Sequence, residues 1–333
     1  MQDIFKKDRK QFEEKWNDLK IFIDYGMLTQ EDFYDRAKDF ALFTDTDGNN
    51  YTFDEYKTLI KDNQTDKDGN LIYLYANNKD EQYSFIEGAT SKGYNVLLMD
   101  GQLDIAVVSM LEQKLEKCRF TRVDSDVIDN LIVKEDKKAN TINASQLDAI
   151  NTIFKSQMPK LPKTEFEVIT QAMGENNIPI ILTQSEYMRR MKEMATIQTG
   201  MSFYGEMPNM YNVVLNSDHQ LVKNIINDEE AQCAASVQPI QQQMDEVNKQ
   251  RNELKDQQKG KKDDEIPQAD KDKVNELDKQ WDELKKQKEN LYAEYASKNP
   301  QVKQLIDLAL LQNGLLKGEA LSNFIKRSIE LMK

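Results

Sequence analysis

Residues 71–75, with the sequence Leu-Ile-Tyr-Leu-Tyr, form a short apolar run that is typical of a buried β-strand. Similar runs recur at Tyr94–Met99 and Arg119–Val123, and the spacing of apolar residues between them predicts helices at Glu81–Ala89 and Leu103–Leu115. Alternation of strands and helices is typical of a small parallel sheet with helices on its faces. This stretch therefore predicts a small α/β unit.

The residues before this unit predict helices. Apolar side chains recur at spacings of three and four, at Phe12, Trp16, Leu19, Phe22 and Ile23, then at Phe33, Ala37, Phe40 and Ala41, and last at Phe53, Tyr56, Leu59 and Ile60. We therefore expect residues 1–60 to be helical and residues 61–134 to form the small α/β unit. The polar stretch 135–143 predicts a linker.

Residues 144–333 predict a second domain, so that the whole fold is a small α/β sandwich followed by an α+β domain. Ser185 is placed to cap one of its helices. The helices and strands expected before residue 229 are Leu147–Phe154, Glu165–Thr170, Ile178–Thr183, Glu186–Met194 and Tyr211–Asn216.

The clearest periodic segment, residues 229–297, predicts an antiparallel helical hairpin inserted into this domain. Apolar residues step by three and four along two arms, with Arg251 and Lys288 interrupting the two series. Lys259–Pro267 contains a glycine and a proline and predicts the turn between the arms. Each arm is expected to be roughly 40 Å long, because a helix rises about 1.5 Å per residue. The hairpin is either a solvated spacer or a docking arm for a partner.

Composition excludes several classes of function. The 333 residues carry a formal net charge of −13, and acidic surfaces repel the phosphates of nucleic acids and anionic lipids. No apolar run is long enough to span a bilayer. Cys118 and Cys233 are the only cysteines, and two lone cysteines favour a reducing, cytoplasmic location.

We expect no catalytic, cofactor or metal site. The chain has one histidine and no glycine motif that would cradle a nucleotide phosphate. DxDGN segments beginning at Asp45 and Asp66 hint at calcium, but both fail the ligand spacing of an EF-hand loop, so plain Asp–Gly turns are expected. His219 follows a strand and is expected to fix the strand-to-helix turn by a hydrogen bond rather than to serve acid–base chemistry.

Methionines gather between residues 188 and 210. Methionine is flexible and polarisable, so it suits surfaces that accept many partners, and the glycines and proline of residues 199–208 predict a loop. Ordinary packing under a loop is the competing explanation. The candidate binding residues are Met188, Met191, Met194, Met201, Phe203, Tyr204, Met207 and Met210.

Two short helices are expected at the end of the chain, at Val302–Leu311 and Glu319–Met332, with Pro300 in a first helical turn and Gly314 at a helix end. Two short helices bury little apolar surface alone, so we expect a homodimer, with docking onto their own domain as the alternative. The candidate interface residues are Leu305, Ile306, Leu310, Leu315, Leu316, Leu321, Phe324, Ile325 and Ile329.

Several short segments together resemble the heat-shock protein 90 family of chaperones, in particular its bacterial HtpG branch. They occur in the family's order over nearly the whole chain outside the hairpin. The segments are Phe12-Glu-Glu-Lys-Trp16, Tyr25-Gly-Met-Leu28, Asn63-Gln-Thr-Asp-Lys67, Ile72-Tyr-Leu74, Val96-Leu-Leu-Met-Asp100, Asn176-Asn-Ile-Pro-Ile180, Tyr187-Met-Arg-Arg-Met191, Leu215-Asn-Ser-Asp-His219 and Asn313-Gly-Leu-Leu-Lys-Gly-Glu-Ala-Leu321.

The resemblance implies that the chain is a piece of a longer protein. Family members have an N-terminal ATPase domain, a middle domain and a C-terminal dimerisation domain, and this chain resembles the late middle and C-terminal domains. ATP and Mg²⁺ would belong to the preceding part, so the resemblance implies neither cofactor nor enzymatic activity here. It implies as partners a second copy, unfolded or partly folded client proteins, and co-chaperones, but no nucleic acid or membrane.

Two departures from the family pattern qualify the resemblance. Leu103-Asp104-Ile105 stands where the family often has Ile-Asp-Glu, which puts a middle-domain client contact through that acid in doubt. The hairpin at 229–297 is longer than the family's usual connection and looks specific to this branch. A coiled-coil scaffold whose hairpin docks a dedicated partner is therefore the alternative to a chaperone fragment.

Overall fold

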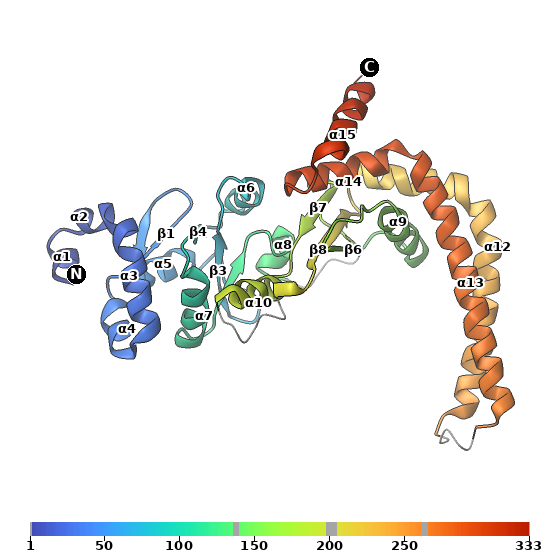
Figure 1. Ribbon diagram of the computed structural model, residues 1–333, viewed down its shortest axis with the longest axis horizontal. Coiled ribbons are helices and arrows are strands. Elements are labelled where there is room, and N and C mark those ends of the chain that lie inside the picture. Colours follow the sequence, from blue (N-terminus) through green and yellow to red (C-terminus); the bar gives the residue numbers. More distant parts are fainter. Residues whose placement is uncertain (1, 136–139, 198–204, 261–265, 333) are drawn as a thin grey trace.

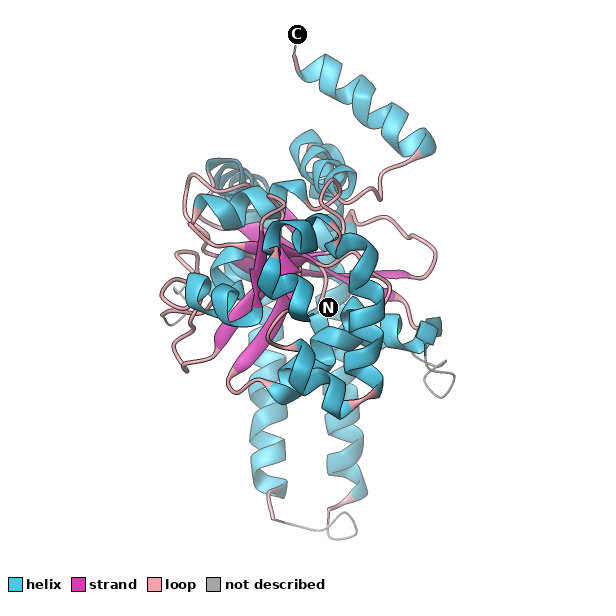
Figure 2. Ribbon diagram, turned by 90° about the vertical axis from the view of Figure 1, so that its left-hand side faces the viewer, coloured by secondary structure: helices cyan, strands magenta, loops and turns pink. Residues whose placement is uncertain are grey.

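The computed structural model describes residues 2–135, 140–197, 205–260 and 266–332. Its elements follow one another along an elongated body, with the N-terminal helices at one end and a long helical hairpin at the other (Figure 1). In the second view the strands lie in the middle of the molecule, between helices on both sides (Figure 2). The fold is mixed α/β with small sheets, as the sequence predicts.

The first sixty residues contain five helices and a short hairpin of strands. Their bounds are α1 Gln2–Lys7, α2 Arg9–Glu14, α3 Trp16–Thr29, α4 Glu31–Ala37, β1 Leu42–Thr44, β2 Asn50–Thr52 and α5 Phe53–Ile60. The prediction of helices alone is therefore wrong between Leu42 and Thr52. The reason is local, because the Asp45 carboxylate accepts hydrogen bonds from the backbone N–H groups of Asp47 and Asn49 and closes an antiparallel turn.

The predicted α/β unit is confirmed. It consists of β3 Leu71–Ala76, α6 Tyr83–Ser91, β4 Val96–Leu98, α7 Asp104–Lys114, β5 Cys118–Arg122 and the short α8 Ile128–Leu131. All its strand pairs are parallel in the order β4-β3-β5, and every residue of the central strand is buried. The two Asp–Gly turns are also confirmed, with Gly48 and Gly69 at φ of +86° and +80°, where only glycine is unstrained.

The second domain is built on another three-stranded sheet, in the order β6-β8-β7. Strand β6 Thr164–Gln171 runs parallel to β8 Asn209–Asn216, and β7 Ile180–Thr183 runs antiparallel to it. Helices α9 Ala144–Ser156 and α10 Glu186–Ile197 complete this part. The mixture of parallel and antiparallel pairs agrees with the expected α+β class.

The predicted hairpin is present, but it begins earlier than expected. Helix α12 covers Gln220–Gln258 and α13 covers Gln268–Lys298. The first helix starts directly after His219, whose Nδ1 accepts a hydrogen bond from the backbone N–H of Leu221 at 3.1 Å, which confirms the structural role expected for this histidine. At about 1.5 Å per residue, the 39 residues of α12 extend about 58 Å.

The base of the hairpin belongs to the core of the second domain. Cys233, Val237, Tyr292 and Tyr295 are buried in the same hydrophobic cluster as α9 and the second sheet. Lys288, expected as an interruption of the apolar seam, is itself buried and donates hydrogen bonds to Asp148 at 2.7 Å and Gln241 at 2.9 Å. The hairpin is therefore anchored in the domain rather than appended to it.

The chain ends in α14 Pro300–Gln312 and α15 Gly318–Leu331. Pro300 occupies the first turn of α14, as expected, and Gly314 has a φ of +64° after its end. Helix α15 contacts α14 and stands away from the rest of the chain in both views (Figures 1 and 2).

One of three hydrophobic clusters joins the two parts of the chain. Ile72 and Leu74 of β3 share this cluster with Ile181 of β7 and Val214 of β8. The other two clusters lie within the first 120 residues and within the second domain. The expected linker at 135–143, of which residues 136–139 lie outside the described part, therefore connects two parts that pack against each other.

Candidate binding surfaces

Helix α10, which carries the first three candidate methionines, is held against the α/β unit by a buried arginine, Arg189, and a half-buried one, Arg190. Arg189 is only 4% exposed, and its guanidinium donates to Glu186 at 2.8 Å and Glu193 at 2.5 Å on its own helix. It also donates to the hydroxyl of Tyr75 on β3, which in turn donates to Glu186 at 2.8 Å. A buried cation in this position is tolerated because both of its terminal nitrogens are paired, although its Nε has no hydrogen-bond partner among the described residues.

Arg190 makes a second set of contacts across the same boundary. Its guanidinium donates to Glu112 of α7 at 2.7 Å and to the backbone carbonyl of Phe120 on β5 at 2.6 Å. Burial raises the pKa of Glu186, but the positive charges of Arg189 and Arg190 outweigh it and leave that pKa below its usual value. Glu186 is therefore a carboxylate at neutral pH, and the network fixes α10 on the α/β unit.

The methionines of α10 lie outside the three cores. Met188, Met191 and Met194 are half-buried, and none of them belongs to or packs on the hydrophobic clusters of the described residues. Met207 and Met210 are also half-buried, just before and within β8. Met201, Phe203 and Tyr204 lie outside the described residues. The structure thus leaves these half-buried methionines outside the three hydrophobic clusters, on a helix that the two arginines anchor.

The terminal helices divide the candidate interface residues into two groups. Leu305, Ile306, Leu310, Leu316 and Phe324 are buried in the core of their own domain, so they support the helices from inside. Leu315 and Leu321 pack partly on that core. Ile325 and Ile329 of α15 are 49% and 53% exposed, and they form the part of the predicted surface that remains open.

The residues that fix α10 were not among the sequence-based candidates. The methionine spacing predicted a helix face, but nothing near Arg189 and Arg190 in the sequence shows that these arginines are buried. Their partners Tyr75 and Glu112 lie 114 and 78 positions away along the chain. Two adjacent arginines beside apolar residues were the only local signal.

The two cysteines are poorly suited to nucleophilic chemistry. Burial raises the pKa of the Cys118 thiol to about 12 and also raises that of Cys233, so neither cysteine is a ready nucleophile at neutral pH. Within the described ranges, no group of three or more His, Cys, Asp or Glu residues is arranged to hold a metal ion. None of the described helices is both long and apolar enough to cross a membrane.

Comparison with known proteins places this architecture. A family model described as Hsp90 protein matches residues 1–244. Over 332 residues the chain is 71% identical to the chaperone protein HtpG of Bacteroides thetaiotaomicron, 70% to that of Bacteroides fragilis (strain ATCC 25285) and 46% to that of Porphyromonas gingivalis (strain ATCC 33277). These matches cover all of this chain and 48–49% of each relative, so the chain spans about half their length.

The fold consists of a mixed α/β unit joined to an α+β domain with a helical hairpin and two terminal helices. It corresponds to about half of the length of these chaperones. The chain belongs to the Hsp90 protein family. The resemblance drawn from its short motifs, to the bacterial HtpG branch of that family, is confirmed.

Proposed function

We propose that this chain is the polypeptide-binding and self-association part of a chaperone. Its relatives are named chaperones. The observation that carries the proposal is the placement of the methionines on α10. Helix α10 is held in place by the hydrogen bond from Arg189 to Tyr75 and the ion pair between Arg190 and Glu112. Met188, Met191 and Met194 sit on this helix, yet they pack on no core of the described residues. Adaptable apolar side chains on a fixed helix suit the weak binding of many partly folded proteins.

Self-association is the second part of the proposal, in which a second copy of this chain covers the exposed face of α15. Ile325 and Ile329 on α15, and Met332 directly after its end, are exposed, whereas Phe324 is buried. A helix of 14 residues that packs on one neighbour alone gains little stability. Pairing α15 with the same helix of a second copy would bury this apolar stripe in a symmetric bundle.

The proposal assigns no reaction, nucleotide or metal to this part of the protein. The ATPase activity, ATP and Mg²⁺ expected for the family would belong to the half of the relatives' length that this chain does not cover. We propose a cytoplasmic location, with client proteins, a second copy and co-chaperones as partners.

Client binding is tested by how well this chain suppresses the aggregation of a test protein that unfolds on heating. Replacing Met188, Met191 and Met194 by Ser should weaken suppression severalfold, because each half-buried methionine would contribute apolar contact area to a bound client. Met158→Ser is the matched control, since Met158 is equally half-buried but packs on the core of the second domain. Full suppression by the triple variant would refute the assignment of α10.

A further inference from the structure

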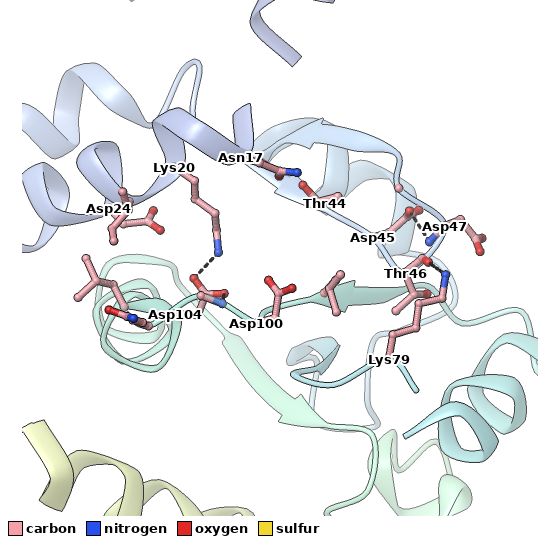
Figure 3. A pocket seen from close by; sticks show the side chains of 16 residues that line it. Asn17, Lys20, Asp24, Thr44, Asp45, Thr46, Asp47, Lys79, Asp100 and Asp104 are labelled. Atoms are coloured by element: carbon pink, nitrogen blue, oxygen red, sulfur yellow. Dashed lines mark hydrogen bonds and ion pairs between the residues drawn. The ribbon is translucent and has the colours of Figure 1, made fainter. Parts of the chain in front are cut away.

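A pocket of about 760 Å³ opens between α3, the β1–β2 turn and the segment that joins β4 to α7. Its lining carries five carboxylates and two ammonium groups, and we call it the acidic pocket (Figure 3). The charged residues that define it are Asp24, Asp45, Asp47, Asp100, Asp104, Lys20 and Lys79. A pocket of this size and charge would attract a cation larger than a single ion.

Two of the carboxylates already have structural partners. Asp45 accepts hydrogen bonds from the backbone of Asp47 and Asn49 and from the side chain of Asn95, and it holds the turn. Asp104, at the start of α7, accepts from the backbone N–H of Gly101 at 2.9 Å and pairs with Lys20 across the pocket. Neither of these two carboxylates is free for a ligand.

Asp24 differs from both of them. It is only 4% exposed, lines the pocket and forms no hydrogen bond or ion pair within the described residues. Lys20, one helical turn away on α3, reaches Asp104 instead, and Figure 3 shows the Asp24 carboxylate turned toward that side of the pocket. A buried carboxylate without a partner is costly, and an incoming cation would remove that cost.

Two further carboxylates extend the site away from Asp24. Asp100 and Asp47 are exposed, line the pocket, and make no side-chain hydrogen bond or ion pair in the described part of the chain. The ammonium group of Lys79 donates to the backbone carbonyl of Thr46 and forms no ion pair with either of them within the described residues. In Figure 3, Asp24, Asp100 and Asp47 follow one another across the pocket.

Apolar side chains in the same lining decide the kind of cation. Ile21, Leu98 and Leu103 also line the pocket and would pack on a methylene chain. A hard metal ion prefers a cage of oxygen ligands, which the described residues do not form. We propose that the acidic pocket binds the ammonium or guanidinium group of a lysine or arginine side chain in an extended segment of a bound polypeptide. That the cationic group belongs to a bound polypeptide rests on the proposed function, whereas the preference of the pocket for a cation does not.

Fluorescence anisotropy with two labelled peptides tests the site. One peptide carries two arginines among alanines and serines, and the other carries citrulline, the neutral isostere, in their place. The arginine peptide should bind about tenfold more tightly, because charge-assisted hydrogen bonds are stronger than neutral ones. Asp24→Asn and Asp100→Asn should each remove most of this preference, and equal binding by both variants and the unchanged chain would overturn the proposal. Asp100 is exposed, so its replacement leaves the fold intact.

The two Asp–Gly turns supply a matched control. Asp47 and Asp68 occupy the same position in turns of the same sequence pattern, and both are exposed, but only Asp47 lines the pocket. Asp47→Asn should weaken binding of the arginine peptide about threefold, whereas Asp68→Asn should leave it unchanged. An equal loss in both variants would show general attraction to the net charge of −13 and would overturn the proposal.

The pH profile gives a further readout of Asp24. Burial, and then the neighbouring charge of Asp104, raise its pKa to about 7 against the opposing effect of Lys20, and these are the charged groups that face it. The carboxylate binds a cation only when ionised, so affinity for the arginine peptide should fall from pH 8 to pH 6. The same profile should be flat in Asp24→Asn, and a fall of equal size in both would contradict the assignment.

Two further measurements distinguish a failure of this site from a failure of the proposed function. Met191→Ser should leave the preference for arginine over citrulline unchanged, so the methionine surface can fail while the acidic pocket holds. Free spermidine should displace the arginine peptide only in large excess. Displacement at equal concentration would identify a free polyamine as the occupant and overturn the polypeptide source.

Discussion

Helices α10 and α15 both bring apolar side chains to the surface, but the chain holds them in different ways. Helix α10 is fixed by buried ion pairs and hydrogen bonds from Arg189 and Arg190 to the α/β unit. Helix α15 is joined to α14 by the burial of Phe324, the Arg327–Asp307 ion pair and a hydrogen bond from Gln304 to Ser328 at 2.8 Å. The first arrangement makes a fixed platform, and the second leaves a helix that another molecule would complete.

The largest effect is expected at the anchor of α10. Arg189→Met removes the partner of Tyr75, Glu186 and Glu193, although Glu186 keeps its ion pair with Arg190 at 2.6 Å. Because several charge-assisted contacts of a buried side chain are lost together, the cost should be about 3 kcal/mol of stability. Urea-induced unfolding followed by circular dichroism measures the loss. A change no larger than that of Lys298→Met, whose ion pair with Glu294 is exposed, would show that α10 is not anchored as described.

The second effect concerns the open face of α15. Ile325→Glu together with Ile329→Glu should raise the dissociation constant of the dimer about 100-fold, because charges would replace buried apolar area on both copies. Leu59→Glu is the matched control, since Leu59 is 50% exposed on α5 and should leave the dimer unchanged. Sedimentation velocity distinguishes the variants. Unchanged association in the double variant would show that the open face of α15 is not the surface through which the chain self-associates.

The smallest effect concerns the attachment of α15 to its own subunit. Arg327→Met removes one partner of Asp307, which is buried but keeps its ion pair with Lys303 at 3.0 Å. The loss should be about 1 kcal/mol, so backbone amides of α15 should exchange with deuterium about fivefold faster. Amides of α10 should keep their protection in this variant, and faster exchange in both helices would show that the two are not held independently.

Patterns that repeat along the chain predicted much of this fold. The apolar run at 71–75 and its neighbours gave the parallel sheet, and the three-and-four spacing after residue 229 gave the hairpin. The hairpin of β1 and β2 was missed because three-residue strands are too short for a visible alternation of apolar and polar residues.

The candidate surfaces could be predicted only in part. Spacing placed Met188, Met191 and Met194 on one helix, but it could not show that the adjacent arginines point to partners in another part of the chain. The same limit applies to α14 and α15, where apolar periodicity marks Leu305 of the first and Ile329 of the second alike. Only the packing shows that the first is buried within its own subunit and the second is exposed.

The solution mass of the chain tests the central claim, that the open face of α15 is covered by a second copy. Light scattering at tens of micromolar should give twice the chain mass of 38.7 kDa. The Ile325→Glu and Ile329→Glu double variant should give the mass of a single chain under the same conditions. A single-chain mass for the unchanged protein would contradict the account, and α15 would then be a helix that lies open without a second copy.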